Sequence, residues 1–165
     1  MPFSDEEEII VLDSPRLING FLIAGAGLFF LSFFFNAFCT EYNCTKGGEA
    51  LLSGFFLFIF GGGGRGDAPT GAGVVWVSWL ANPFLLASWM LLANSKKWAW
   101  VASFLALLFS LSFLCFDKVL ENADTGSYGV IKRTGAGYSL WIVSCVVTFA
   151  GAEVIRRKRK TILEL

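Results

Sequence analysis

Histidine is absent from all 165 residues of the chain. Histidine supplies the common axial ligand of haem, ligands in most zinc sites, and the base of Ser-His and Cys-His catalytic pairs. Its absence excludes histidine-ligated haem and chlorophyll, most zinc sites and those catalytic pairs. We therefore predict no catalytic residue, no cofactor and no metal site, and we expect that the protein is not an enzyme.

Charge is scarce as well: 16% of the residues are charged, whereas 55% are hydrophobic. The segment from Val74 to Ala93 carries no charge and is long enough to cross the roughly 30 Å hydrocarbon core of a bilayer as a helix. Asn82 and Pro83 lie near its middle. Proline there predicts a kink, and Asn82 is expected to face another helix because lipid offers it no hydrogen-bond partner.

Similar apolar segments recur along the chain and predict an all-α membrane protein with a single membrane domain. The segment at about 50–60 is too short to span and predicts a re-entrant or interfacial outer helix. The predicted transmembrane helices are four, at about 17–38, 74–93, 98–116 and 138–154. They leave an acidic cytoplasmic leader (1–16), two outer loops (39–73 and 117–137) and a basic cytoplasmic tail (155–165).

Several side chains in the spans carry local predictions. Small residues gather in the first half of the first span and either let a neighbouring helix approach closely or are simply tolerated in lipid. Serines of the third span can bond back to their own helix. Glu153 is spaced to pair with Arg156 and Arg157. The small residues are Gly20, Ala24, Gly25, Ala26 and Gly27, and the serines are Ser103, Ser110 and Ser112.

The distribution of basic residues predicts the orientation. With both termini and the connection between the second and third spans on one side, that side holds eight of the 13 basic residues. The positive-inside rule therefore places both termini in the cytoplasm. The predicted anchors at this membrane surface, where the basic tail meets anionic headgroups, are Trp98, Trp100, Arg156, Arg157, Lys158, Arg159 and Lys160. This run is a poor candidate for nucleic-acid binding, and we predict no nucleic-acid partner.

Cys39 and Cys44 follow the first span directly, on the predicted outer side. Their spacing suits a small disulfide loop in an oxidising compartment, and two free thiols are the alternative. If the protein were an enzyme, redox chemistry at this cysteine pair would be the best candidate activity. The four residues between the two cysteines form a longer spacer than that of the usual redox dithiol. Cys115 and Cys145 lie in apolar spans and are expected to behave as small hydrophobic residues.

Three sequence patterns occur in a recognisable order. They are the glycine-flanked segment 47–54, the pentapeptide Trp79-Leu80-Ala81-Asn82-Pro83, and the stretch from Gly135 to Trp141. With this order, nearly the whole chain resembles a group of small bacterial four-span membrane proteins of uncharacterised function. The pentapeptide is the most specific part. The resemblance implies a bacterial inner-membrane protein and implies no reaction.

Two functions follow as expectations. The first is a non-catalytic accessory or structural membrane protein. Its expected partners are the lipid bilayer and either the subunits of a larger membrane complex or further copies of the chain. It is favoured because the spans carry no deep charge, whereas transport and proton pathways usually require one. The second is a transporter or channel component that acts as an oligomer, with Asn82 in a discontinuous helix.

Overall fold

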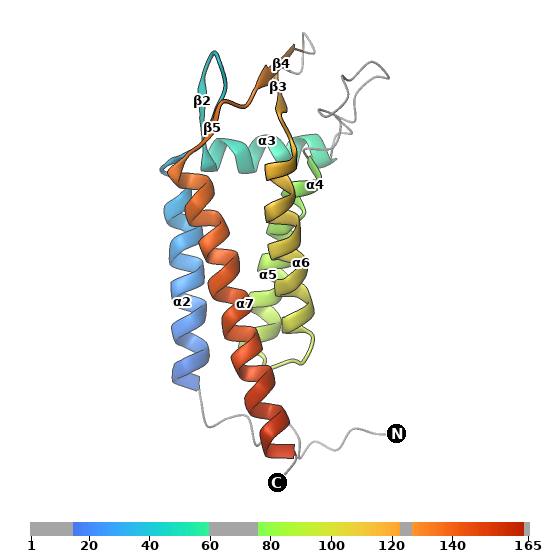
Figure 1. Ribbon diagram of the computed structural model, residues 1–165. Helices are drawn as coiled ribbons and strands as arrows, with labels where there is room; N and C mark the ends of the chain where they lie inside the picture. Colours follow the sequence, from blue (N-terminus) through green and yellow to red (C-terminus); the bar gives the residue numbers. More distant parts are fainter. Residues whose placement is uncertain (1–14, 60–75, 123–126, 164–165) are drawn as a thin grey trace.

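The computed structural model describes residues 15–59, 76–122 and 127–163. It is mostly helical, and four long helices run side by side (Figure 1). They are α2 (Pro15–Ser32), α5 (Ala81–Ala93), α6 (Ala99–Ser112) and α7 (Ala136–Leu163). A fifth helix, α3 (Gly47–Ile59), lies across one end of this bundle, which we name the capped end. The opposite end, where α2 begins and α7 finishes, is named the basic end.

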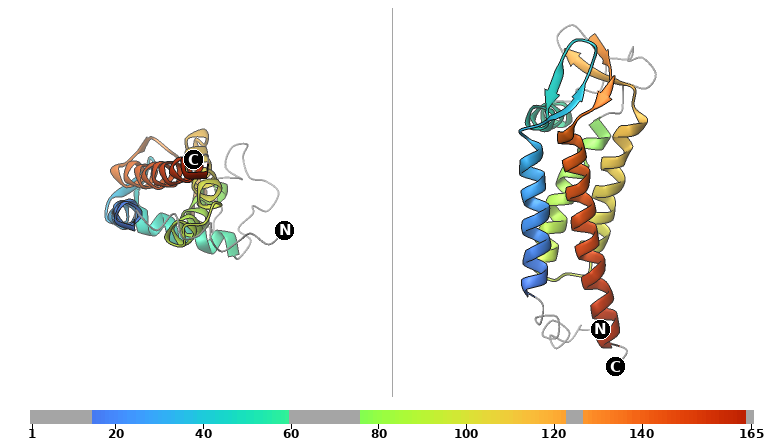
Figure 2. Two further views of the ribbon diagram at one scale, coloured as in Figure 1. Left: turned by 90° about the horizontal axis from the view of Figure 1, so that it is seen from below. Right: turned by 60° about the vertical axis from the view of Figure 1, so that its left-hand side comes forward.

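Short strands sit above α3 at the capped end (Figures 1 and 2). Strands β2 (Cys44–Lys46), β1 (Asn36–Cys39) and β5 (Arg133–Thr134) form one sheet in that order, while β3 (Lys118–Asn122) pairs with β4 (Ser127–Val130). The prediction of an all-α fold is wrong in this respect. The backbone groups of the loops need hydrogen-bond partners, and antiparallel pairing between the two outer loops supplies them.

The first predicted span is too long at its outer end, because α2 ends at Ser32 rather than at Phe38. Turn bonds follow, among them the bond from Phe35 N–H to Ser32 O at 3.3 Å. The N–H groups of Gly47 and Gly48 then donate to the carbonyls of Phe35 and Phe33. The start of α3 thus takes the carbonyls that a longer α2 would have used, and the chain leaves the helix.

Two other helix ends differ from the sequence-based bounds. Helix α7 continues to Leu163, past the predicted end of the fourth span at residue 154. Arginine and lysine are good helix formers, and Glu153 pairs with two of these residues across one turn. The third span becomes α6 followed by one turn of 3₁₀ helix, η2 (Phe113–Cys115). The second is divided into α4 (Trp76–Trp79) and α5.

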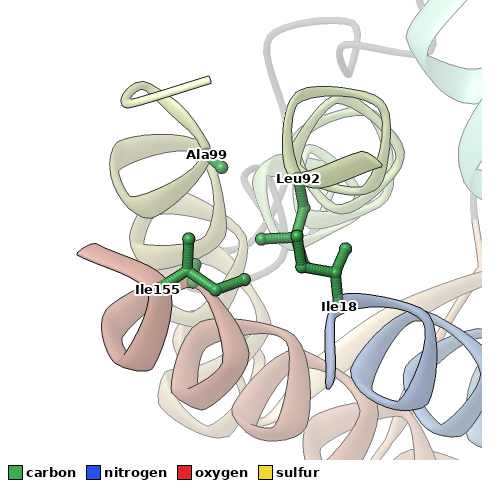
Figure 3. Packing of buried hydrophobic residues seen from close by; sticks show 5 residues of the cluster. Ile18, Leu92, Ala99 and Ile155 are labelled. Atoms are coloured by element: carbon green, nitrogen blue, oxygen red, sulfur yellow. The ribbon is translucent and has the colours of Figure 1, made fainter. Parts of the chain in front are cut away.

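Buried apolar side chains fill the bundle in three layers. The middle layer contains Phe29, Leu85, Ala106 and Cys145, one from each long helix. The layer at the basic end is shown in Figure 3, where Ile18, Leu92 and Ile155 point toward one another from α2, α5 and α7. At the capped end the core is completed by Ala37, Phe38, Phe113 and Tyr138. The two strand residues in that list join the outer sheet to the helices.

Two of the described helical segments, Pro15–Ser32 and Ala136–Lys158, are long and apolar enough to cross a membrane. Two further apolar segments, Val77–Ala93 and Ala99–Cys115, are shorter. Length and composition therefore suggest membrane association, which agrees with the scarcity of charge.

Candidate functional site

Helix α5 begins just after an interruption in the helical hydrogen bonding. Pro83 has no N–H, so it cannot make the helical bond to the carbonyl four residues back, which belongs to Trp79. The side-chain amide of Asn82 donates to that carbonyl at 3.0 Å instead. The predicted kink is therefore an interruption at Leu80, between α4 and α5, and Asn82 supplies the bond that Pro83 leaves out.

The same asparagine connects α5 to α7. Its Oδ1 atom accepts a hydrogen bond from Trp141 Nε1 at 3.1 Å, and only 6% of the residue is exposed. The indole N–H of Trp79 donates in turn to Leu51 O of α3 at 2.9 Å. We call Trp79, Asn82 and Trp141 the Asn82 cluster. It links α3, α4, α5 and α7, so the structure places Asn82 against another helix and Pro83, which is exposed, at its edge.

A second polar group, the Gly25 cluster, lies deeper in the bundle. Ser144 Oγ donates to Gly25 O at 2.8 Å, and Trp89 Nε1 donates to Thr148 Oγ1 at 2.9 Å. The Thr148 hydroxyl donates to Ser144 O of its own helix at 2.9 Å. A Cβ atom at Gly25 would lie 2.8 Å from Thr148 Oγ1, so only glycine permits α2 to approach α7 this closely.

The other small residues of α2 do not serve this contact. Gly20 and Gly27 have open space where a Cβ atom would stand, and Ala24 is exposed. The close helix–helix approach predicted for the small residues is therefore found at Gly25 and not at Gly20 or Gly27. The serines of α6 behave as predicted: Ser103 and Ser110 donate to Trp100 O and Leu107 O, three residues earlier, and Ser112 donates to Phe109 O.

Helix α3 closes the capped end of the bundle. Leu51 packs against the middle layer of the core, and Gly54 approaches the indole ring of Trp79 so closely that a Cβ atom would overlap it. Leu52 and Phe56 are exposed, while the ring of Phe55 packs against that of Trp79 with 5.8 Å between the ring centroids. Helix α3 therefore lies across the end of the bundle with one face held by Trp79 and with apolar side chains exposed beside it.

The cysteine pair closes the turn between β1 and β2. The Sγ atoms of Cys39 and Cys44 lie 1.99 Å apart, at disulfide distance, and the two residues are directly paired in the sheet. Within the turn, Thr40 N–H donates to Asn43 O at 2.8 Å. Lys132, beside β5, forms an ion pair with Glu41 at 2.6 Å, so the second outer loop is attached to this turn. Cys115 and Cys145 are free thiols.

At the basic end, one carboxylate holds two guanidinium groups. Glu153 accepts from Arg156 Nε at 2.7 Å and from Arg157 Nε at 2.7 Å, which confirms the pairing predicted from their spacing. The Arg156 guanidinium also lies 4.9 Å from the ring centre of Trp100. Trp98 is 62% exposed at the start of α6. Of the predicted anchors, Arg159 has no described side chain.

Within residues 15–59, 76–122 and 127–163, no cluster of three or more His, Cys, Asp or Glu side chains could hold a metal ion.

The sequence did not reveal the roles of Trp89, Trp141 and Thr148. The available signal was that an indole N–H in an apolar span needs an acceptor, which a threonine or asparagine on a neighbouring span can provide.

Comparison of the chain with protein-family models, curated proteins and solved structures finds no match.

Proposed function

We propose that the protein is a non-catalytic integral membrane protein with four spans that packs as a small subunit against a larger membrane complex. One observation carries this proposal: the buried side chains of Asn82, Thr148 and five serines are hydrogen-bonded within the chain, whereas the buried Nε1 atom of Trp100 has no partner. Asn82 and Thr148 bond to indole N–H groups of neighbouring helices, and the serines bond to backbone carbonyls. These serines are Ser32, Ser88, Ser103, Ser110 and Ser144.

Such an interior serves packing rather than passage. Transport and proton pathways usually contain ionisable groups within the membrane, facing the bundle interior or a water-filled cavity. Among the described residues, the buried polar side chains include no Asp, Glu, Lys or Arg. The polar groups of the bundle therefore favour a rigid structural unit.

The arrangement of the ends supports the proposed topology. The start of α2, the connection between α5 and α6, and the end of α7 lie together at the basic end (Figure 1). The strands and α3 lie at the other end. With the basic end in the cytoplasm, the positive-inside rule is satisfied and the cysteine pair faces the oxidising side. The sequence resemblance supports the bacterial inner membrane as the location.

The exposed face of α2 supports the proposal that a helix of another membrane protein packs against this chain. Ile23 and Phe30 are 73% and 57% exposed, and Gly20 and Gly27 leave open space between such side chains. In a membrane this face meets lipid or another helix, and the glycines permit a neighbouring backbone to approach closely.

The test is gentle detergent extraction from the native membrane, followed by size separation and identification of the chains that migrate together. The expected result is a partner in fixed proportion. Gly27→Leu, which projects into open space, should release that partner while the bundle keeps its stability. A particle that contains only this chain would overturn the subunit proposal.

The alternative function is a transporter or channel component that acts as an oligomer. The break at Leu80 favours it, because transporters build sites from interrupted helices. Solute flux in vesicles distinguishes the two functions. Loss of flux in Asn82→Leu with unchanged assembly would support the alternative, and loss of complex recovery without any flux would support the subunit.

A further inference from the structure

We propose that the basic end of the bundle binds the phosphate of an anionic phospholipid at Arg157, with an acyl chain of the same lipid along one face of α7. The inference rests on the membrane placement proposed above, but it does not depend on a protein partner.

The guanidinium groups at the basic end are held in place before any ligand arrives. Arg156 donates two hydrogen bonds to Glu153, from Nε at 2.7 Å and from Nη2 at 2.9 Å, and its guanidinium lies over the ring of Trp100. Arg157 donates to the same carboxylate at 2.7 Å. Because these side chains are already ordered, binding costs less conformational entropy.

The charge of this group is not balanced. One carboxylate serves two guanidinium groups, which leaves a net positive charge, and the side chain of Arg157 remains 78% exposed. A guanidinium fork matches two oxygens of a phosphate group, so an anion of that shape is the complementary ligand.

A row of exposed apolar residues leads along α7 to Arg157. Val143, Val146 and Val154 are 45%, 45% and 36% exposed, and Ala150 between them is exposed as well. These positions recur every three or four residues, so they lie on one face of the helix, and Arg157 follows three residues after Val154 in the same row. A soluble anion would make no contact with this row, whereas the acyl chain of a phospholipid would pack along it.

The depth of the site also fits a lipid. Arg157 follows Ile155 by two residues on α7, and Ile155 belongs to the core layer at the basic end. Trp98 is exposed at this end, and tryptophan prefers the level of the headgroups. The phosphate would therefore meet Arg157 at the depth where the headgroup layer begins.

The test is lipid binding to the purified, delipidated protein, measured by native mass spectrometry. Phosphatidylglycerol and phosphatidylcholine with identical acyl chains are the two probes. We expect preferential binding of phosphatidylglycerol, weakened about fivefold or more in Arg157→Gln, because one basic residue at a membrane surface contributes about that factor. Lys132→Gln, which removes a paired lysine at the capped end, is the matched control and should bind as the unaltered protein does.

Three results would overturn the proposal. They are equal binding of both lipids, an Arg157→Gln variant with unchanged affinity, or displacement of the lipid by glycerol phosphate at equal concentration, which would show an anion site that ignores the acyl chain. Arg157→Lys keeps the charge and guards against a folding defect, since it should retain most of the binding. The membrane placement is tested separately, on the membranes before purification, by whether release of the protein requires detergent.

Discussion

The indole N–H of Trp141 donates to Asn82 Oδ1 at 3.1 Å, and the side-chain amide of Asn82 donates to Trp79 O at 3.0 Å. One side chain therefore performs two tasks: it satisfies a backbone carbonyl that proline leaves without its helical bond, and it joins α5 to α7. Both bonds lie where lipid and the protein interior offer few alternatives, which makes this pair a sensitive point of the structure.

Asn82→Leu should lower the free energy of unfolding by about 1–2 kcal/mol, because two buried polar groups lose a partner. Unfolding in mixed micelles with increasing denaturing detergent measures the change. Pro83→Ala supplies the control, since it returns an N–H that can bond to Trp79 O. The double variant should lose less stability than the sum of the single variants. Strict additivity would show that the two residues do not cooperate.

Two glycines of α2 should respond differently to the same substitution. Gly25→Ala should destabilise the bundle by about 1–3 kcal/mol, because the added methyl group meets Thr148 Oγ1 and forces α2 away from α7. Gly27→Ala, with nothing within 4 Å of its position, should leave the stability unchanged or slightly higher. The same unfolding assay compares them, and equal effects would contradict the close approach at Gly25.

Gly54→Ala should loosen α3 without unfolding the bundle. The added methyl group would overlap the Trp79 ring, so the bond from Trp79 Nε1 to Leu51 O should weaken. Hydrogen exchange followed by mass spectrometry should then be faster in peptides from residues 47–59 and unchanged in α7. Ser53→Ala alters an exposed neighbour on the same helix and serves as the control. Unchanged exchange in α3 would show that Trp79 does not hold it.

The cysteine pair should react with a membrane-impermeant maleimide only after reduction, and only from the outer face of intact cells. Replacing Cys115 and Cys145 by serine removes the free thiols and isolates the signal. Breaking the pair with Cys39→Ser should cost about 2 kcal/mol by the loop-closure estimate for a loop this short. Labelling without reductant would indicate free thiols, and labelling only after cell lysis would reverse the proposed orientation.

The helices could be predicted from the sequence because long apolar runs without charge leave few other structures. The short outer helix could be located for the same reason: its run of apolar residues is limited by glycines on both sides. The pairing of Glu153 with Arg156 and Arg157, and the self-bonded serines of α6, depend only on spacing within one helix. Each of these features depends on residues that are close together in the sequence, so a local sequence pattern is enough to predict it.

The strands and the helix–helix bonds could not be predicted in this way. Strand β1 pairs with β5, which is far along the chain, and neither is long enough to show an alternating pattern. Ser144 bonds to Gly25 across a separation of 119 residues. Spacing could mark Gly25 as one of five small residues of α2, but it could not show which of them faces α7.

Helix α7 is made after α2, α5 and α6, and this order has a consequence for folding. During synthesis, Gly25, Trp89 and Asn82 are made before Ser144, Thr148 and Trp141, the residues to which they bond. The earlier helices must therefore wait, with polar groups lacking their final partners, until the ribosome has delivered α7.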